Sequence, residues 1–250
     1  MGQFGKVLNL RILFDTSILA TATRDHGIGA YARRLARALG GHPVAGVEMV
    51  FLGYGRSGFR LCSSAHEALR PTTRFRRYHW SYHFRLELNR WARRARADLV
   101  HLPHTAASPL YGLRCPWVVT AHDLIPFRFS RHYPDWSSGG PWGRRWLDRR
   151  RYRRARRVVA VSDATAADVG RLCDISAARI DVVGHGLDAA WAAGPTQATW
   201  LRDYVFYVGD ADPRKDLATL LQGLGESGTG WSLVWAGVTS PSRAARVRAT

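Results

Sequence analysis

Residues 10–39 read LRILFDTSILATATRDHGIGAYARRLARAL and combine an apolar run of strand length with a helix-like stretch over residues 29–39. The same alternation continues along the chain. Further apolar runs are VEMVFL, DLVHL, WVVTA, RVVAVS, RIDVVG, YVFYVG and SLVWAG, and further helix-like stretches are residues 82–97, 144–156, 164–173, 215–224 and 240–249. Apolar strands that alternate with helices predict a doubly wound α/β domain, whose parallel sheet is covered on both faces. Ligands of such domains bind at the carboxyl ends of the strands.

A domain boundary is expected around residues 190–203, where a Gly-Pro pair and weak periodicity precede a new strand. We place the first domain at residues 1–195 and the beginning of a second at residues 196–250. The second part offers only a strand, a helix, a strand and a final helix, which is too little for an α/β domain covered on both faces. The sequence therefore predicts one nearly complete domain and one incomplete domain.

The chain is strongly basic, with 37 Lys and Arg residues against 19 Asp and Glu residues and a formal net charge of +18. Only Lys6 and Lys215 are lysines. Such a charge draws a protein towards an anionic partner: a nucleic acid, an acidic lipid or a phosphorylated ligand. A general preference for Arg, with its charge solvated on helix faces, explains the composition equally well.

Cysteine usage and hydropathy indicate the cellular compartment of the protein but not its function. Cys62, Cys115 and Cys173 show neither metal-ligand spacing nor a disulfide framework, which suits a reducing cytosol. No apolar run approaches the length that spans a bilayer, and the first residues lack the features of a signal peptide. We expect a cytoplasmic protein.

The stretch FYVGDADPRKDLATLL, residues 206–221, carries two adjacent cations after a strand. Gly209 ends the apolar run, and Arg214 and Lys215 follow Pro213, where we expect a helix to open. Two cations beside the positive end of a helix dipole suit a diphosphate, which Arg can grip bidentately while Lys acts as a point charge. A solvated pair on a loop is the alternative interpretation.

Asp210 and Asp212 in the same stretch match the D-x-D pattern that holds a divalent metal in one class of sugar transferase. Two carboxylates two residues apart are common in loops, and two strong cations lie within five positions of them. We therefore expect no metal site here.

Several other strand ends carry polar or glycine residues. Gly27 and Gly29 stand where the loop after the first strand enters a helix, and glycines there allow close approach by a ligand. His122 and Asp123 end the run WVVTA, which makes a role in a site plausible although a structural histidine is the alternative.

Two further strand ends have simpler interpretations. Ser162 ends the run RVVAVS and is expected to cap the next helix. His185 and Gly186 follow RIDVVG in a loop, and a histidine tolerates left-handed backbone geometry better than most residues, so the turn alone can explain it.

The order of these motifs is more specific than any one of them. The series FDTS…GIGAYARRLARAL, VHLPHTAASPL, VVTAHDLIPF, RRARRVVAVSDATAADV, RIDVVGHGLD and YVFYVGDADPRKDLATLLQGL resembles the group 1, or family 4, nucleotide-sugar glycosyltransferases over about residues 10 to 238. The resemblance implies a GT-B-like architecture: a Rossmann-type doubly wound acceptor-side domain followed by an incomplete Rossmann-type domain that binds the nucleotide sugar.

The resemblance also implies roles for individual residues. Gly27 and Gly29 match the loop that faces the donor diphosphate and acceptor, and His122 matches the active-site histidine near the transferred sugar. Arg214 and Lys215 match the basic pair that grips the donor diphosphate. We assign His122 and Asp123 to the catalytic groups; the remaining residues expected to line the site are Ser162, His185, Gly186 and Gly209.

Enzymes of this family are typically retaining and need no metal in the site, so the resemblance implies no cofactor, with the nucleotide sugar as substrate. The implied partners are a GDP- or UDP-linked hexose, mannose-like in view of GIGAY and HDLIPF, and a glycan or lipid-linked acceptor. The implied context is the synthesis of surface polysaccharide or lipopolysaccharide.

The sequence departs from the family pattern in two places. The family has two glutamates eight residues apart in the second domain, whereas none of Glu48, Glu67, Glu87 and Glu226 has such a partner. His185 stands where the family usually has Asn. We expect a piece of a longer enzyme, a chain whose site a second polypeptide completes, or an inactive remnant.

Two stretches, RFRRYHWSYHFRLELNRWARRARADL and WGRRWLDRRRYRRARR, mix arginines with aromatic residues. Arg with Trp and Tyr on helices suits an anionic membrane surface, and here implies peripheral contact with the inner face of the cell membrane. Solvated helix faces are an equal alternative, and nucleic acid is the least favoured partner. A basic, non-catalytic protein that binds lipid or nucleic acid is the alternative function.

Overall fold

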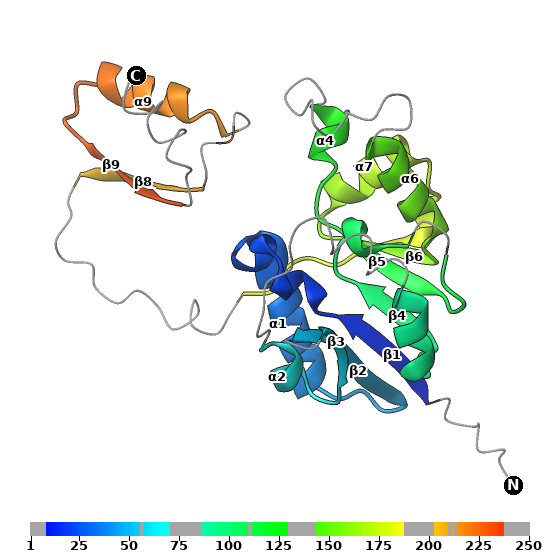
Figure 1. The fold of residues 1–250 in the computed structure, drawn as a ribbon. Coiled ribbons are helices and arrows are strands. Elements are labelled where there is room, and N and C mark those ends of the chain that lie inside the picture. Colours follow the sequence, from blue (N-terminus) through cyan, green and yellow to red (C-terminus); the bar gives the residue numbers. More distant parts are fainter. Residues whose placement is uncertain are drawn as a thin grey trace, which may run out of the picture. The chain divides into compact units, whose positions relative to one another are not determined.

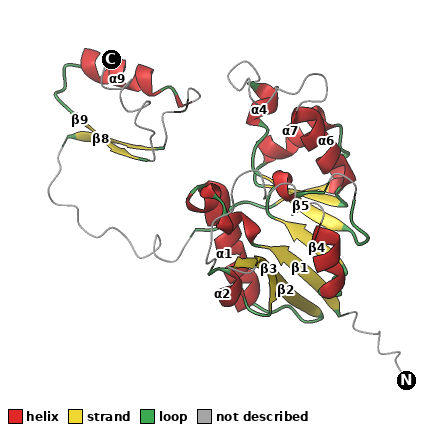
Figure 2. Cartoon of the chain, viewed as in Figure 1, coloured by secondary structure: helices red, strands yellow, loops and turns green. Residues whose placement is uncertain are grey.

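The computed structural model describes residues 9–55, 58–70, 87–109, 112–129, 144–187, 203–209, 212 and 215–237. The chain forms two compact units, Met1–Gly186 and Leu187–Thr250 (Figures 1 and 2). The predicted boundary between residues 195 and 196 and the predicted helix over residues 240–249 lie outside the described residues.

The first unit contains the following elements in chain order: β1 (Leu10–Asp15), η1 (Ser17–Ala20), η2 (Ala22–Asp25), α1 (Gly27–Gly41), β2 (Val47–Gly55), β3 (Gly58–Cys62), α2 (Ala65–Ala68), a helix over residues 87–94, β4 (Leu99–Leu102), η3 (Thr105–Ala107), β5 (Trp117–Ala121), α4 (Ile125–Arg128), α6 (Arg144–Arg154), β6 (Arg157–Ala160), α7 (Asp163–Cys173), η6 (Ala177–Arg179) and β7 (Ile180–Val182). The η elements are short 3₁₀ helices.

The strands of this unit form one sheet in the order β3-β2-β1-β4-β5-β6-β7. All neighbouring pairs are parallel except β2 and β3, which are antiparallel. The predicted parallel α/β sheet is thus confirmed, and β3 is an addition that the sequence did not indicate. The strand order reverses beside β1, which pairs with β2 on one side and β4 on the other, so a ligand crevice is expected at the carboxyl ends of these strands.

Both faces of the sheet are covered, as the apolar strands require. Leu13 and Phe14 are fully buried neighbours in β1, and because side chains alternate along a strand they enter different cores. Leu13 belongs to the core beneath the helix over residues 87–94, α6 and α7. Phe14 belongs to the smaller core beneath α1 and α2 (Figure 1).

Several arginines of α6 stabilise the fold. Arg149 and Arg153 donate hydrogen bonds to the carbonyls of Leu172 and Cys173 in the last turn of α7, at 2.9 and 2.8 Å. These carbonyls carry the negative end of the helix dipole, so cations are favoured there. Part of the large positive charge of the chain therefore has a structural role.

The second unit is a strand–helix–strand unit made of β8 (Tyr204–Val208), α9 (Leu217–Glu226) and β9 (Ser232–Ala236). Its two strands are parallel, with Tyr204 paired to Ser232. Burial alternates along β8: Phe206 is 58% and Val208 65% exposed, whereas the intervening residues are half-buried. One apolar face of this small sheet is therefore open to solvent.

Asp15 at the end of β1 yields a prediction about stability and pH. Its carboxyl is fully buried, and one oxygen accepts a hydrogen bond from the Ser17 backbone N–H at 2.8 Å. Burial raises the pKa of Asp15 from 3.8 to about 6, although the bonds from Ser17 act in the opposite direction. Between these two pH values the unfolded chain loses this proton and the folded chain keeps it, so the contribution of Asp15 to stability falls as pH rises.

Asp15→Asn removes this titration. Relative to the wild type, the unfolding free energy of the variant should rise between pH 4 and 6 by up to about 3 kcal/mol. Denaturant unfolding over a pH series measures the difference. A wild-type and variant curve that run parallel across this range would show that the carboxyl ionises normally.

Candidate active site

The carboxyl ends of the parallel strands hold most of the side chains that the sequence singles out. His122 follows β5 directly, Ser162 lies just beyond β6, and His185 follows β7. Gly27 is the first residue of α1, the helix that carries Tyr31. Tyr31 contacts two of these histidines, so the fold brings α1 together with the ends of β5 and β7.

Tyr31, His122 and His185 form a cluster of three rings. The ring of Tyr31 packs edge-on against His122 and His185, with 4.8 and 5.1 Å between ring centroids. The two imidazoles stack with centroids 6.0 Å apart and planes 16° from parallel. His185 is exposed and His122 is half-buried, so His185 forms the outer side of this ring cluster. Edge-on aromatic contacts of this kind fix the orientation of the rings.

The purely conformational interpretation of His185 is wrong. Neither Gly184, His185 nor Gly186 has a positive φ, so the loop does not need left-handed geometry at these positions. What distinguishes His185 in the structure is its side chain, which contacts Tyr31 and His122.

A hydrogen bond fixes the proton of His122. Its Nε2 lies 2.8 Å from the carbonyl oxygen of Pro103. Because a carbonyl oxygen only accepts, Nε2 carries the hydrogen, and the neutral ring then has its lone pair on Nδ1. The ring can therefore accept a hydrogen bond from a ligand hydroxyl through Nδ1.

The surroundings of His122 favour this neutral form. Burial is the main cause that lowers its pKa below the ordinary value, and the nearby His185 lowers it further. The bond to the Pro103 carbonyl and the charge of Asp123 act in the opposite direction but are outweighed. His122 is therefore uncharged at neutral pH.

Thr120 connects the ring cluster to the interior of the sheet. Its Oγ1 lies 3.1 Å from the hydroxyl of Tyr31 and 3.1 Å from Nε2 of His101. Burial lowers the pKa of His101 to about 4, so this ring is neutral. A chain of hydrogen-bonding groups thus runs from His101 on β4 through Thr120 on β5 to Tyr31 on α1, and it fixes the position of the Tyr31 hydroxyl.

Asp123 and Ser162 have local structural contacts. Asp123 is exposed, and its Oδ1 accepts a hydrogen bond from the Ile125 N–H at 3.1 Å where α4 begins. Ser162 caps α7 as expected, with its Oγ 3.2 Å from the Thr165 N–H. Thr165 in turn donates from Oγ1 to the carbonyl of His122 at 3.2 Å, which ties the start of α7 to the ring cluster. A catalytic role for Asp123 stays a prediction.

The two glycines at the start of α1 differ in the space that surrounds them. A Cβ at Gly29 would collide with the backbone of Arg24, so glycine is required where α1 packs against η2. A Cβ at Gly27 would meet no atom within 4 Å, and no side chain caps the first turn of α1 among the described residues. An uncapped helix start beside open space can bind an anion.

In the second unit, Gly209 lies beside Lys215. Gly209 has φ +149°, and a Cβ there would collide with the Lys215 ammonium, so glycine permits their close approach. The Lys215 N–H donates to the Asp212 carbonyl at 2.9 Å and closes the turn after β8. Arg214, like Asp210 and Pro213, lies outside the described residues, so the basic pair is seen only through Lys215.

Pro213, where a helix was expected to open, lies outside the described residues. Helix α9 begins at Leu217. Asp216 has the left-handed values φ 46° and ψ 51°, which an α-helix cannot contain, so Lys215 precedes the helix instead of forming its first turn. Lys215 therefore lies two residues before the start of α9.

Across the described ranges, no group of three or more His, Cys, Asp or Glu side chains is placed to hold a metal ion. The helices that the structure describes also include none with the length and apolar character needed to cross a membrane.

Sequence reasoning missed three residues of this site: Tyr31, His101 and Thr120. A signal was present for two of them. Tyr31 stands four residues after Gly27, one helical turn away, and so projects on the same side of α1. His101 interrupts the apolar run LVHL in a buried strand, which is an unusual place for an imidazole.

The first unit is thus a Rossmann-type domain that carries the ring cluster at the ends of its parallel strands. The sequence profile of Glycosyltransferase Family 4 matches residues 26–191, which include this cluster, and the chain belongs to that family. No curated protein gave a significant sequence match.

Solved structures share the fold. The lipopolysaccharide outer core galactosyltransferase WaaB matches with 14% identity and a TM-score of 0.54, over 94% of this chain and 63% of WaaB. Sucrose-phosphate synthase from Thermosynechococcus elongatus matches with 15% identity and a TM-score of 0.61, over 96% of this chain and 66% of the synthase. UDP-GlcNAc 2-epimerase from Neisseria meningitidis, bound to UDP-GlcNAc, matches with 12% identity and a TM-score of 0.56, over 96% and 69%. The expected GT-B-like fold is confirmed, and the chain spans less than two thirds of the length of WaaB.

The ring cluster predicts how His122 responds to loss of Tyr31. Tyr31→Ala uncovers the His122 ring, and because burial is the main cause of its lowered pKa, the pKa of His122 should rise towards the ordinary value. NMR titration of the imidazole C–H resonances measures the change. Tyr31→Phe is the matched control, since it keeps the ring contacts and loses only the hydroxyl bond to Thr120. An unchanged His122 titration in the alanine variant would contradict this assignment.

Proposed function

We propose that the chain forms the acceptor side and the beginning of the donor side of a glycosyltransferase. The transferase moves a hexose from a nucleotide diphosphate sugar to a glycan or lipid-linked acceptor, in the synthesis of surface polysaccharide or lipopolysaccharide. The observation that carries the proposal is the cluster of His122, Tyr31 and His185 at the strand ends of a Family 4 domain.

The proposed chemistry rests on hydrogen bonding and charge. His122 offers a neutral imidazole whose Nδ1 can accept a hydrogen bond from a hydroxyl of the transferred sugar. Negative charge builds on the leaving diphosphate as the glycosidic bond breaks, and fixed cations and helix N-termini stabilise it. Lys215, together with Arg214, supplies the cations, and the uncapped start of α1 at Gly27 supplies backbone N–H groups. We propose a retaining reaction that needs no metal.

The nucleotide is proposed to be UDP or GDP. A galactosyltransferase and an epimerase bound to UDP-GlcNAc share the fold, which supports a UDP-linked sugar. The GIGAY and HDLIPF motifs favour a mannose-like sugar and GDP. Specificity for the base and sugar depends on the donor domain.

The second unit has a surface suited to completing that domain. Phe206 and Val208 on β8 present apolar side chains to solvent on one face of the two-stranded sheet. In a doubly wound domain this face is covered by helices. We propose that further structure, on the same or a second polypeptide, covers it and supplies the missing pair of glutamates.

Titration with nucleotide sugars tests the donor assignment. The double variant Arg214→Ala/Lys215→Ala should weaken binding of UDP- and GDP-hexoses by about tenfold or more, because the diphosphate loses both counter-charges. Calorimetry on the purified chain measures the affinity. Arg90→Ala/Arg93→Ala, which removes two exposed arginines of the helix over residues 87–94, is the matched control. Equal donor affinity in the wild type and the Arg214/Lys215 variant refutes the role of the basic pair.

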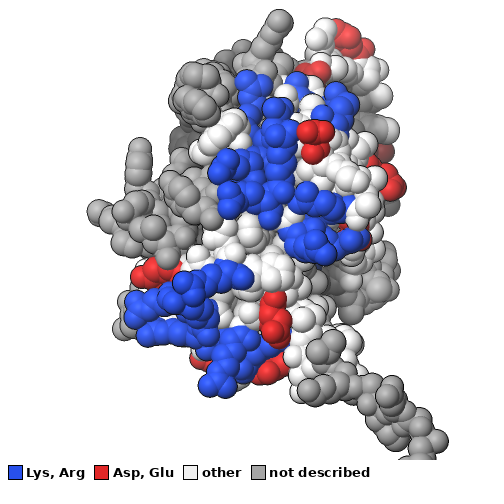
Figure 3. Space-filling view, turned by 90° about the vertical axis from the view of Figure 1, so that its right-hand side faces the viewer, with Lys and Arg blue, Asp and Glu red and all other residues white. Residues whose placement is uncertain are grey.

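A basic surface supports the second part of the proposal, peripheral contact with the inner face of the cell membrane. We define the arginine face by Arg90, Arg93, Arg94, Arg150 and Arg154, which are exposed on the helix over residues 87–94 and on α6. Figure 3 shows Lys and Arg side chains gathered in a broad band on one side of the molecule.

The two helices of the arginine face are linked by the loop at Gly112. The carbonyl of Gly112 accepts a hydrogen bond from the Asn89 amide at 3.2 Å, and a Cβ on Gly112 would lie only 3.0 Å from the guanidinium of Arg154. Arg94 stacks on Trp91 at 5.1 Å, and Arg150 on Trp146 at 5.6 Å. Guanidinium groups paired with indole rings suit the headgroup region of an anionic bilayer.

Sedimentation with vesicles tests this contact. The wild type should pellet with vesicles that contain anionic phospholipid, and Arg90→Glu/Arg93→Glu/Arg150→Glu should remain in the supernatant, because attraction becomes repulsion. Neutral phosphatidylcholine vesicles and raised salt are the controls, and both should abolish pelleting. A wild-type protein that stays in the supernatant at physiological salt overturns the membrane proposal.

A further inference from the structure

A groove lies on the opposite face of the sheet from the arginine face. It is bounded by the second half of α1, by α2 and by the segments around β2 and the end of β3, and its volume is about 760 Å³. This is within the range of sites that bind small molecules. Gly40 lies 13 residues after Gly27 along α1, so the groove is about 20 Å from the uncapped helix start at the proposed active site.

The floor of the groove is apolar. Leu39, Met49 and Leu69 are only partly buried and pack against the small core that contains Phe51. Gly40 explains why α1 and α2 approach closely there, since a Cβ at this position would come within 2.9 Å of the Ala65 Cβ. The groove therefore lies over the small core, beside α1 and α2.

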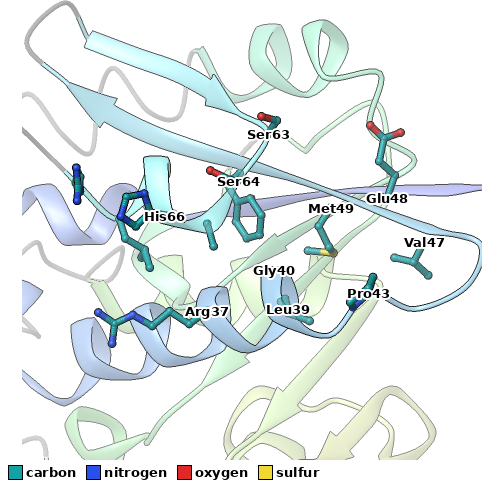
Figure 4. A pocket seen from close by; sticks show the side chains of 14 residues that line it. Arg37, Leu39, Gly40, Pro43, Val47, Glu48, Met49, Ser63, Ser64 and His66 are labelled. Atoms are coloured by element: carbon teal, nitrogen blue, oxygen red, sulfur yellow. The ribbon is translucent and has the colours of Figure 1, made fainter.

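One end of the groove is cationic. Figure 4 shows Arg37 and His66 at one end, Pro43 and Val47 towards the other, and Leu39 and Met49 between them. Arg70, just beyond α2, also lines the groove. Ser63 and Ser64 also line the groove, and Glu48 lies near Val47 at the end away from Arg37, where it pairs with Arg11.

Arg37 and Arg70 have no acidic partner among the described residues. The two nearby carboxylates are engaged elsewhere: Glu48 pairs with Arg11 at 2.7 Å, and Glu67 lies 4.0 Å from Arg60. Arg60 also donates to the carbonyls of Glu67 and Arg70, at 3.0 and 3.4 Å, which fixes the backbone at the end of α2. Arg37 and Arg70 therefore both line the groove without an ion-pair partner among the described residues.

We infer that this groove binds a single-chain anionic amphiphile: one hydrocarbon chain with a terminal phosphate. The phosphate contacts Arg37 and Arg70, and the chain lies over Leu39 and Met49 towards Pro43. A nucleic acid would need cations along the whole groove, whereas the carboxylate of Glu48 lies near its other end. A basic end beside an apolar floor matches an amphiphile instead.

This binding is independent of the proposed sugar transfer, because it involves neither the ring cluster nor the second unit. It also differs from the proposed membrane contact, which uses the opposite face of the sheet. Dodecyl phosphate as a monomer, below its micelle concentration, is the probe that separates the groove from a bilayer surface.

Isothermal titration of the full chain with monomeric dodecyl phosphate should show saturable binding of one molecule. Arg37→Glu/Arg70→Glu should weaken this binding by about tenfold or more. Arg114→Glu/Arg156→Glu makes the same charge change at two exposed arginines outside both the groove and the arginine face, and should alter it by less than about twofold. Inorganic phosphate and dodecanol, which offer only the head or only the tail, should each bind more weakly than dodecyl phosphate.

Three results would overturn the inference. The first is an absence of saturable binding to the monomer, including the case in which the protein binds only vesicles. The second is equal affinity in the Arg37/Arg70 variant and the wild type. The third concerns Met49→Trp, whose larger side chain fills the groove. If this variant differs from the wild type in oligomeric state, a second copy of the chain occupies the groove instead of an amphiphile. Circular dichroism of each variant confirms that it is folded.

Discussion

The burial of β1 is the constraint on which the first unit depends. Leu13 and Phe14 are fully buried and enter cores on opposite faces, so helices must cover both sides of the sheet. Because β1 pairs with β2 on one side and β4 on the other, the strand order reverses beside it. The same topology delivers the ends of β5 and β7 to the start of α1, where the ring cluster forms.

The sequence predicted the elements that have strong apolar periodicity and missed those set by single residues. LRILFD, WVVTA and the helix after Gly27 appear in the structure close to their predicted bounds. β3 was missed because it is short and contains Arg60, so it lacks a clear apolar run. The start of α9 was misplaced because Asp216 adopts left-handed geometry, a choice that helix propensity does not reveal.

The site was predictable as a set of strand ends but not as a set of contacts. His122 and His185 could be located because each follows an apolar run. Their partner Tyr31 lies on a helix, and only the three-dimensional structure shows that its ring contacts both histidines while its hydroxyl lies 3.1 Å from Thr120 Oγ1. The net charge was likewise ambiguous in sequence, since arginines such as Arg153 cap α7 and others form an exposed face.

The central claim is that the ring cluster at the strand ends is where the sugar-transfer chemistry takes place. The most direct measurement follows the imidazole resonances of His122, His185 and His66 while a nucleotide diphosphate hexose is added. If the claim is correct, the resonances of His122 and His185 shift in a saturable manner, and that of His66, on α2 in the distant groove, stays in place. A saturable shift of His66 alone, or no shift of His122 and His185 at any donor concentration, would contradict it.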